Sequence, residues 1–177
     1  SSRCMTVPGL ETRPMPGGGW LLAGAALCGG RAYALLADFF AQTARMMGMD
    51  TNAPYAAMEG LLTSAGRPED VPTVLPLFEG TRQDSTQTGS ITGLTAENFT
   101  PLHLIYGMMD GMAHELHQMY QAYRTAGGTA KKLIGSGGGL RNNRFLCESF
   151  SRAFDSEITL SDGREEASCG AALYAAD

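Results

Sequence analysis

The pattern of hydrophobic and polar positions along the chain predicts short strands that alternate with amphipathic helices. The longest helix is predicted to start at Pro101, with Thr100 as its N-cap, and to reach about Ala126. Apolar residues recur along it at three- and four-residue steps and mark one core face: Leu102, Ile105, Met109, Met112, Leu116, Met119 and Tyr123. All three histidines of the chain fall on the opposite face and are interpreted as solvated.

The other elements follow from the same alternation. Further helices are predicted at Ala32–Met47, Asn52–Ala65, Asn143–Phe154 and in the tail after Asp162. Strands are predicted at Arg3–Val7, Trp20–Leu27, Ser90–Leu94, Glu157–Leu160 and in the run that ends at Gly135. Val71–Phe78 contains prolines and is predicted to be an edge strand or an extended loop. This order of elements predicts an α/β domain.

Three details of this assignment concern the first third of the chain. Pro8–Gly19 is rich in proline and glycine and is predicted to be a loop or a hairpin turn. Trp20–Leu27 is apolar throughout, as expected of a strand that is covered on both faces. In the Ala32–Met47 helix, four large apolar residues are assigned to the buried side: Leu35, Leu36, Phe39 and Phe40.

Two predicted strand–helix junctions are rich in glycine. One reads Gly135-Ser136-Gly137-Gly138-Gly139 and is followed by Asn142, a candidate N-cap for the next helix. The other contains Gly29 and Gly30. Glycines at such junctions let a ligand contact the main chain directly, and the helix N-terminus offers free amides to an anion. A tight turn without a ligand explains the same residues, so the glycines alone leave both interpretations open.

Composition limits the class of protein. The chain has 177 residues, of which 44% are hydrophobic, so one domain with a sizeable core is expected. The net charge is −5 without a basic stripe, which argues against nucleic acid and membrane-surface partners. The four cysteines match no zinc pattern and are expected to be reduced, as in a cytoplasmic protein. The first residue is Ser1 and not a methionine, so a piece of a longer protein is expected.

Two short motifs suggest chemistry but have simpler explanations. His114-Glu115-Leu116-His117 has histidines three residues apart, whereas the zinc protease signature needs a four-residue spacing. The polar loop after Pro76 contains Glu79, Arg82 and Asp84, which suit a sugar or a phosphate, but a solvated loop is the alternative.

The tail resembles the C-terminal half of the FGGY carbohydrate kinases, which belong to the sugar kinase, actin and chaperone ATPase superfamily. The resemblance rests on Gly-Gly-Gly-x-x-Asn-x-x-Phe at 137–145, the strand Glu157–Leu160, and Glu-Ala-x-x-Gly-Ala-Ala at 166–172. Pro76–Arg82 and Gly89–Thr95 are similar to further family segments, with Thr81 where glutamate is usual. In detail, this stretch resembles the sedoheptulokinase branch.

This resemblance implies a ribonuclease H-like, actin-like ATPase domain over residues 1–177, with a mixed sheet flanked by helices. It implies that ATP or ADP contacts Gly30, Gly137, Gly138, Gly139 and Asn142. An absent N-terminal domain is expected to hold most of the Mg²⁺ and sugar contacts and the general-base aspartate, so no catalytic residue or metal ligand is assigned here. The resemblance thus predicts one half of an ATP-dependent kinase for a sugar such as sedoheptulose, inactive alone. A homodimer is also allowed. The alternative is a non-catalytic nucleotide-binding or regulatory ATPase module.

Overall fold

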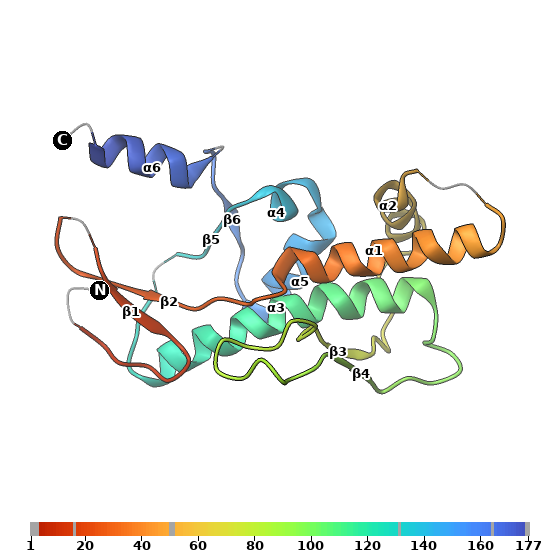
Figure 1. The fold of residues 1–177 in the computed structure, drawn as a ribbon, viewed down its shortest axis with the longest axis horizontal. Coiled ribbons are helices and arrows are strands. Elements are labelled where there is room, and N and C mark those ends of the chain that lie inside the picture. The colour runs from red at the N-terminus through yellow and green to blue at the C-terminus, as the bar shows by residue number, and fades with distance from the viewer. Residues whose placement is uncertain (1–3, 16, 50–51, 131, 164, 176–177) are drawn as a thin grey trace.

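The fold is built along one long central helix, α3 (Pro101–Thr125). The computed structural model describes residues 4–15, 17–49, 52–130, 132–163 and 165–175. Figure 1 shows α1 and the β3–β4 pair lying along α3. The other helices are α1 (Gly29–Met46), α2 (Pro54–Ala65), α4 (Gly138–Asn142), α5 (Arg144–Phe154) and α6 (Glu166–Ala175). Helices and strands alternate along the chain, which confirms the predicted α/β class.

The strands form three separate pairs, two antiparallel and one parallel. They are β1 (Glu11–Pro14) with β2 (Trp20–Ala23), β3 (Thr73–Leu75) with β4 (Ser90–Thr92), and β5 (Ile134–Gly135) with β6 (Thr159–Leu160). Both strand orientations occur, but the described strands do not join into one continuous mixed sheet. Each strand has only two to four residues. The outer edge of each pair therefore has few backbone groups that could bond to a further strand.

The N-terminal region differs from the prediction. Pro8–Gly19 is not only a turn, because β1 lies within it and pairs with β2 in a hairpin. The predicted strand at Arg3–Val7 is wrong for residues 4–7, which are irregular, and Arg3 lies outside the described residues. The strand at Trp20 ends at Ala23, and Leu21 is exposed, so it is not covered on both faces.

The middle of α3 is buried on nearly all sides. Thr100 accepts a hydrogen bond from the backbone of His103, which confirms the predicted N-cap. The core includes Ile105, Tyr106, Met108, Met109, Met112 and Ala113, a wider set than one stripe. Strand β3 crosses so close to the helix that a Cβ on Gly111 would lie 2.3 Å from the carbonyl oxygen of Val74. Glycine therefore permits burial on a side that periodicity alone marks as polar.

Helix α1 packs through small side chains rather than through its largest ones. Its buried residues are Ala32, Leu36, Ala37 and Ala41. Leu35 is 40% exposed and Phe39 is 54% exposed, so their assignment to the buried side is wrong. The physical reason is close packing, since the alanine face lets the helix approach its neighbours in the core.

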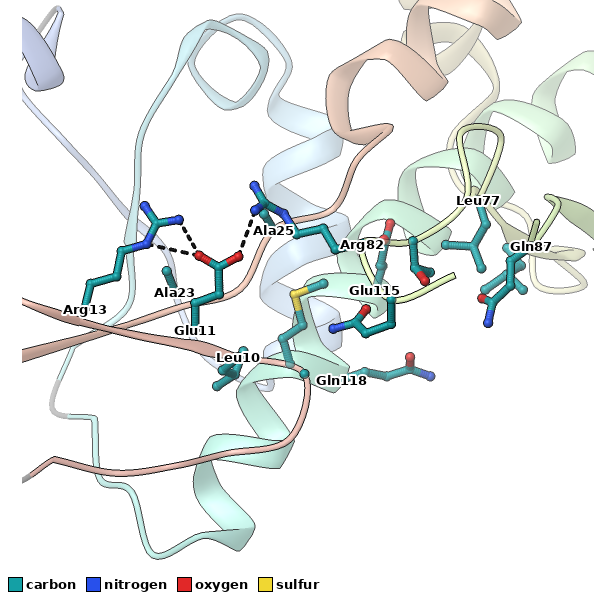
Figure 2. A pocket seen from close by; sticks show the side chains of 15 residues that line it. Leu10, Glu11, Arg13, Ala23, Ala25, Leu77, Arg82, Gln87, Glu115 and Gln118 are labelled. Atoms are coloured by element: carbon teal, nitrogen blue, oxygen red, sulfur yellow. Dashed lines mark hydrogen bonds and ion pairs between the residues drawn. The ribbon is translucent and has the colours of Figure 1, made fainter. Parts of the chain in front are cut away.

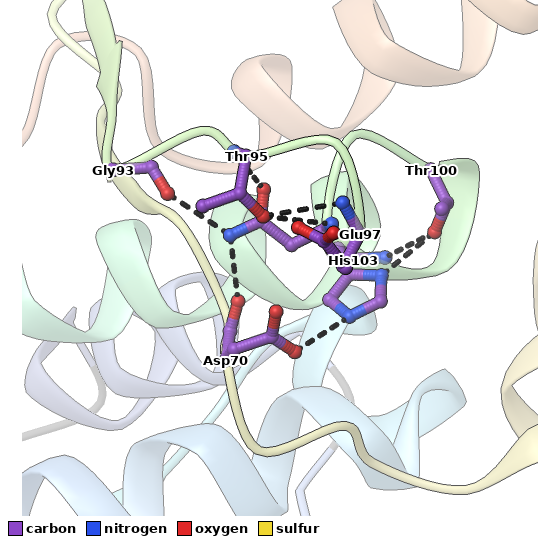
Figure 3. Close-up of polar contacts among 7 residues, drawn as sticks. Asp70, Gly93, Thr95, Glu97, Thr100 and His103 are labelled. Atoms are coloured by element: carbon purple, nitrogen blue, oxygen red, sulfur yellow. Dashed lines mark hydrogen bonds and ion pairs between the residues drawn. The ribbon is translucent and has the colours of Figure 1, made fainter.

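The prediction that all three histidines are solvated is wrong for His103. Its ring Nδ1 lies 2.7 Å from the Thr100 hydroxyl and its Nε2 lies 3.0 Å from Asp70, as Figure 3 shows. Only 13% of its side chain is exposed. His117 is half-buried, with its ring 5.0 Å from that of Phe154, and only His114 is exposed. Helix α3 therefore has covered polar residues that a two-sided pattern does not separate from solvated ones.

Asn98 organises the loop that leads into α3. It is 3% exposed; its side-chain oxygen accepts from the Thr95 amide at 2.8 Å. Its Nδ2 donates to the carbonyls of Asp70 at 3.0 Å and Gly93 at 2.9 Å (Figure 3). These bonds tie the segment after β4 to the segment before β3.

We expect Asn98→Ala to lower the free energy of unfolding by about 2 kcal/mol, because it leaves buried backbone groups without partners. Urea unfolding monitored by circular dichroism measures the change. The exposed neighbour Glu97→Ala is the control and should change stability by less than about 0.5 kcal/mol. Equal effects of the two substitutions would contradict this role of Asn98.

Candidate functional site

The glycine-rich junction after β5 begins with one buried glycine. A Cβ on Gly135 would lie 2.7 Å from Ile158 Cγ2 and 3.0 Å from Leu140 Cδ1, so no larger residue fits without a shift. The chain then turns at Gly137, whose φ of 96° favours glycine, and enters the short helix α4. The close strand contact explains the glycine at position 135, and the turn explains the glycine at position 137.

Asn142 does not cap the following helix, in contrast to the prediction. It is the last residue of α4, and its neighbour Asn143 is the N-cap of α5. The Asn143 side-chain oxygen accepts from the amide of Leu146 at 3.1 Å. Both residues are asparagines, so the residue type alone did not show which of the two caps the helix. Asn142 is exposed and its amide remains on the surface beside the glycines.

Gly137, Gly138 and Gly139 form an exposed, side-chain-free surface. A Cβ on Gly137 would meet no atom within 4 Å, and one on Gly138 would meet only the Asn142 amide nitrogen, at 3.8 Å. A Cβ on Gly139 would meet only Leu146 Cδ2, also at 3.8 Å. Neither packing nor backbone conformation therefore requires glycine at positions 138 and 139, and the open space beside all three glycines suits a flat ligand.

The second glycine junction lies near the first. Gly30 is exposed in the first turn of α1, with no atom within 4 Å of an added Cβ. One turn later, the Tyr33 hydroxyl lies close enough to the side chain of Asn143, between α4 and α5, for that side chain to lower its pKa. We call the exposed surface formed by Gly30, Gly137–Gly139 and Asn142 the glycine patch.

Tyr33 was not singled out from the sequence. Burial raises the pKa of its hydroxyl, and the hydrogen bond from Asn143 partly opposes this rise. Its ring stacks on Tyr55 of α2, with centroids 6.1 Å apart. The signal that could have found it is its spacing, because a residue three positions after Gly30 lies on the same side of the helix.

Arg141 connects the glycine patch to the tail motif. Its guanidinium donates to the carbonyl of Gly163 and pairs with Glu166, the first residue of α6. It also lies 3.4 Å from the carbonyl of Ser161. A hydrogen bond to its own backbone, and then bonds from Ser161 and Arg141, hold the pKa of Glu166 below its ordinary value. The two most specific sequence motifs are therefore in direct contact.

Helix α6 itself does not pack as its small residues suggest. The side chains from Ser168 to Ala175 are exposed, including Leu173 at 73%. Figure 1 shows the helix lying apart from α1 and α3. Small side chains permit a helix to pack closely on a sheet, but no such packing of α6 is found among the described residues.

The other candidate residues do not contribute to the glycine patch. Arg82, in the loop after Pro76, forms an ion pair with Glu11 of β1 at 2.8 Å. His114 and His117 each contact a glutamine rather than a shared centre. Within the described ranges, no group of three or more His, Cys, Asp or Glu side chains is placed to hold a metal ion. None of the four cysteines, all of which lie in the described ranges, forms a disulfide. None of the described helices is long and apolar enough to cross a membrane.

Comparison with known proteins agrees with this geometry. The pattern of the FGGY family of carbohydrate kinases, C-terminal domain, matches residues 3–176. The structure is similar to xylulose kinase from Rhodospirillum rubrum, with a TM-score of 0.78 and 23% identity over 99% of this chain. It is also similar to gluconate kinase from Lactobacillus acidophilus (TM-score 0.77, 18% identity, 98% of this chain). A third similar structure is Plasmodium falciparum glycerol kinase with ADP (TM-score 0.73, 18% identity, 98% of this chain).

The chain spans only part of each of these structures, since each match covers 34% of the other chain. No curated protein sequence matches this one. The shared fold and the matched pattern confirm the predicted ribonuclease H-like, actin-like ATPase domain.

Proposed function

Since the chain belongs to the FGGY family of carbohydrate kinases, we propose that its glycine patch binds the adenine and ribose of ATP or ADP. The observation that carries this proposal is the open space above Gly137–Gly139, with the Asn142 amide beside Gly138. A flat base stacks closely only where side chains are absent. An asparagine amide offers both a donor and an acceptor to the edge of the base. The residues of the patch therefore fit the adenosine part of the nucleotide.

The remaining contacts of the patch hold it in shape. Asn143 links it to Tyr33 of α1, and Arg141 links it to Glu166 of α6. Gly30 lies on the side of the patch formed by the first turn of α1, where we place the ribose and the phosphates. Neither Tyr33 nor Arg141 is assigned contact with the nucleotide; both position the main chain that makes the contact.

We place phosphoryl transfer itself in the complete protein. There, residues 1–177 form the C-terminal domain, and an N-terminal domain supplies the general-base aspartate, most contacts to Mg²⁺ and the sugar. ATP-bound Mg²⁺ neutralises the charge that develops on the transferred phosphoryl group. Both halves must close around the substrates, because the chemistry depends on positioning.

The proposed acceptor of the phosphoryl group is a sugar hydroxyl. More specifically, we propose that the sugar is a ketose such as sedoheptulose. It rests on the residues from Phe78 to Leu94 alone, since the similar structures include xylulose, gluconate and glycerol kinases. A cytoplasmic role in carbohydrate metabolism follows from the same proposal, as does a sugar as the main partner. A homodimer is compatible with it.

Nuclear magnetic resonance of the ¹⁵N-labelled chain tests where the nucleotide binds. Addition of ADP with Mg²⁺ is expected to shift the amide signals of Gly30, Gly137–Gly139 and Asn142. The amide of Gly60, exposed in the middle of α2, should not move. Shifts confined to other parts of the chain would refute the assignment of the patch.

The activity of the chain alone is a separate prediction. Residues 1–177 are expected to show no ATP-dependent phosphorylation of a ketose, because the general base lies outside them. A coupled assay for ADP release, with sedoheptulose and with xylulose, measures this. Sustained turnover by the chain alone would overturn the division into two halves. In the complete protein, phosphate release without any sugar would favour a regulatory ATPase instead.

A further inference from the structure

A second cavity lies between the β1–β2 hairpin, the loop after Leu77 and helix α3. It has a volume of about 420 Å³, within the range of small-molecule sites. It shares no residue with the glycine patch. Figure 2 shows Glu11 and Arg13 from β1, Arg82 from the loop, and Glu115 from α3 lining the same space. Three segments that are far apart in the sequence therefore supply its walls.

The loop that forms one wall is tightly folded. Thr81 and Asp84 exchange backbone and side-chain hydrogen bonds of 2.9 and 3.0 Å. A Cβ on Gly80, where φ is 71°, would lie 2.7 Å from the Cα of Ser85. These contacts direct Arg82 to the hairpin, where its Nη1 lies 2.8 Å from Glu11 Oε1.

Two arginines and one glutamate meet in the wall of the cavity. The Glu11 carboxylate pairs with both Arg13 and Arg82, so one carboxylate is shared by two guanidinium groups. These two arginines also hold the pKa of Glu11 below its ordinary value, with Arg13 as the larger cause. Both arginine side chains are about half exposed, at 56% and 48%. Their remaining N–H groups are geometrically suited to a phosphate.

Glu115 provides a polar group inside the cavity. Its Oε2 is buried and has no hydrogen-bond partner among the described residues. Burial raises the pKa of this carboxyl, which favours the protonated form that both donates and accepts hydrogen bonds. Glu115 is also among the residues that line the cavity, so its side chain contributes a polar group to the wall.

The rest of the lining suits a molecule with many hydroxyl groups. Three amide side chains and one hydroxyl lie around the cavity: Gln83, Gln87, Gln118 and Thr81. Leu10, Leu77 and Met119 supply an apolar surface for the carbon-bound hydrogens of such a molecule.

We propose that this cavity binds a small sugar phosphate, with its phosphate between Arg13 and Arg82 and a hydroxyl group on Glu115. The site shares no residue with the glycine patch, so its occupant does not displace the nucleotide that we place there. This inference does not depend on nucleotide binding at the glycine patch, and its test contains no nucleotide.

Calorimetric titration of the chain with ribose 5-phosphate tests the proposal, with ribose and inorganic phosphate as separate ligands. Ribose 5-phosphate is expected to bind saturably, and at least about tenfold more tightly than either fragment. Equal affinities for ribose 5-phosphate and inorganic phosphate would show an anion site only and would overturn the proposal. Absence of saturable binding of ribose 5-phosphate at millimolar concentrations would overturn it as well.

Three variants locate the site. Glu115→Leu should weaken ribose 5-phosphate at least about tenfold and fold normally, since it removes a carboxyl whose Oε2 is buried with no hydrogen-bond partner among the described residues. Arg82→Gln should weaken ribose 5-phosphate by a similar factor and leave ribose unchanged. Glu148→Leu, at an exposed glutamate of α5 outside the cavity, is the matched control and should bind like the parent chain. Unchanged affinity in both Glu115→Leu and Arg82→Gln would place the ligand elsewhere and refute the inference.

Discussion

Replacing Gly138 with leucine is expected to weaken ADP binding, in the presence of magnesium, by at least about 30-fold, or about 2 kcal/mol. Gly138 is exposed, and an added Cβ there would meet only Asn142, at 3.8 Å. A leucine side chain would therefore fit without disturbing the fold but would occupy the space proposed for the base. Calorimetric titration of both forms of the chain measures the loss.

The control for this experiment is Gly60→Leu, the same substitution at an exposed helical glycine with open space around it. It should leave ADP affinity unchanged, and the unfolding midpoints of both variants should stay close to that of the parent. Equal affinity of the parent and Gly138→Leu would contradict the proposed role of the patch. If the chain alone binds no ADP, the same pair of variants is tested in the complete protein. Weaker ADP binding by Gly138→Leu there would show that the patch needs further phosphate contacts, and unchanged binding would show that the glycines form only a turn.

Replacing Gly111 with alanine is expected to destabilise the chain by about 3 kcal/mol, which is a large effect for one methyl group. The added Cβ would lie 2.3 Å from Val74 O and 3.1 Å from Val74 C. Both are backbone atoms of β3, so no side-chain rotation relieves the clash, and α3 and β3 must move apart. Because α3 forms the centre of the core, the separation would also loosen the packing of Met109 and Met112.

Urea unfolding measures this change, and Gly60→Ala is the matched control. On α2, the same substitution meets no atom within 4 Å and should stabilise the chain by up to about 1 kcal/mol through helix propensity. The two substitutions are therefore expected to have opposite signs. A small effect of Gly111→Ala would mean that α3 and β3 do not approach each other as closely as described.

Much of the local structure follows from the sequence. Thr100 and Pro101 determine where α3 begins. The Thr100 hydroxyl accepts a hydrogen bond from a backbone amide of the first turn, and the proline ring fixes a φ angle that suits the first helical position. The position of α2 and the edge character of β3 were predicted for similarly local reasons. The glycines at 137–139 indicated a junction that a ligand can approach, and the family resemblance indicated which ligand.

Contacts between distant segments were not predictable in this way. Whether Asn142 or Asn143 caps α5 depends on where the short helix α4 ends, and this in turn depends on how Leu140 packs beneath the junction. Tyr33 and Asn143 are more than a hundred positions apart, and no local pattern relates them. The same is true of His103 with Asp70 and of Arg82 with Glu11.

The sequence by itself determined the class of the fold, the start of its main helix and the glycine surface that we assign to the nucleotide. These features depend on backbone conformation and on capping, which are set within a few neighbouring residues. The tertiary structure alone decided that α1 packs through its alanines with Phe39 outside, and that Oε2 of Glu115 is buried with no hydrogen-bond partner among the described residues. Periodicity shows which residues share a face of a helix, but only packing decides which element, if any, covers that face.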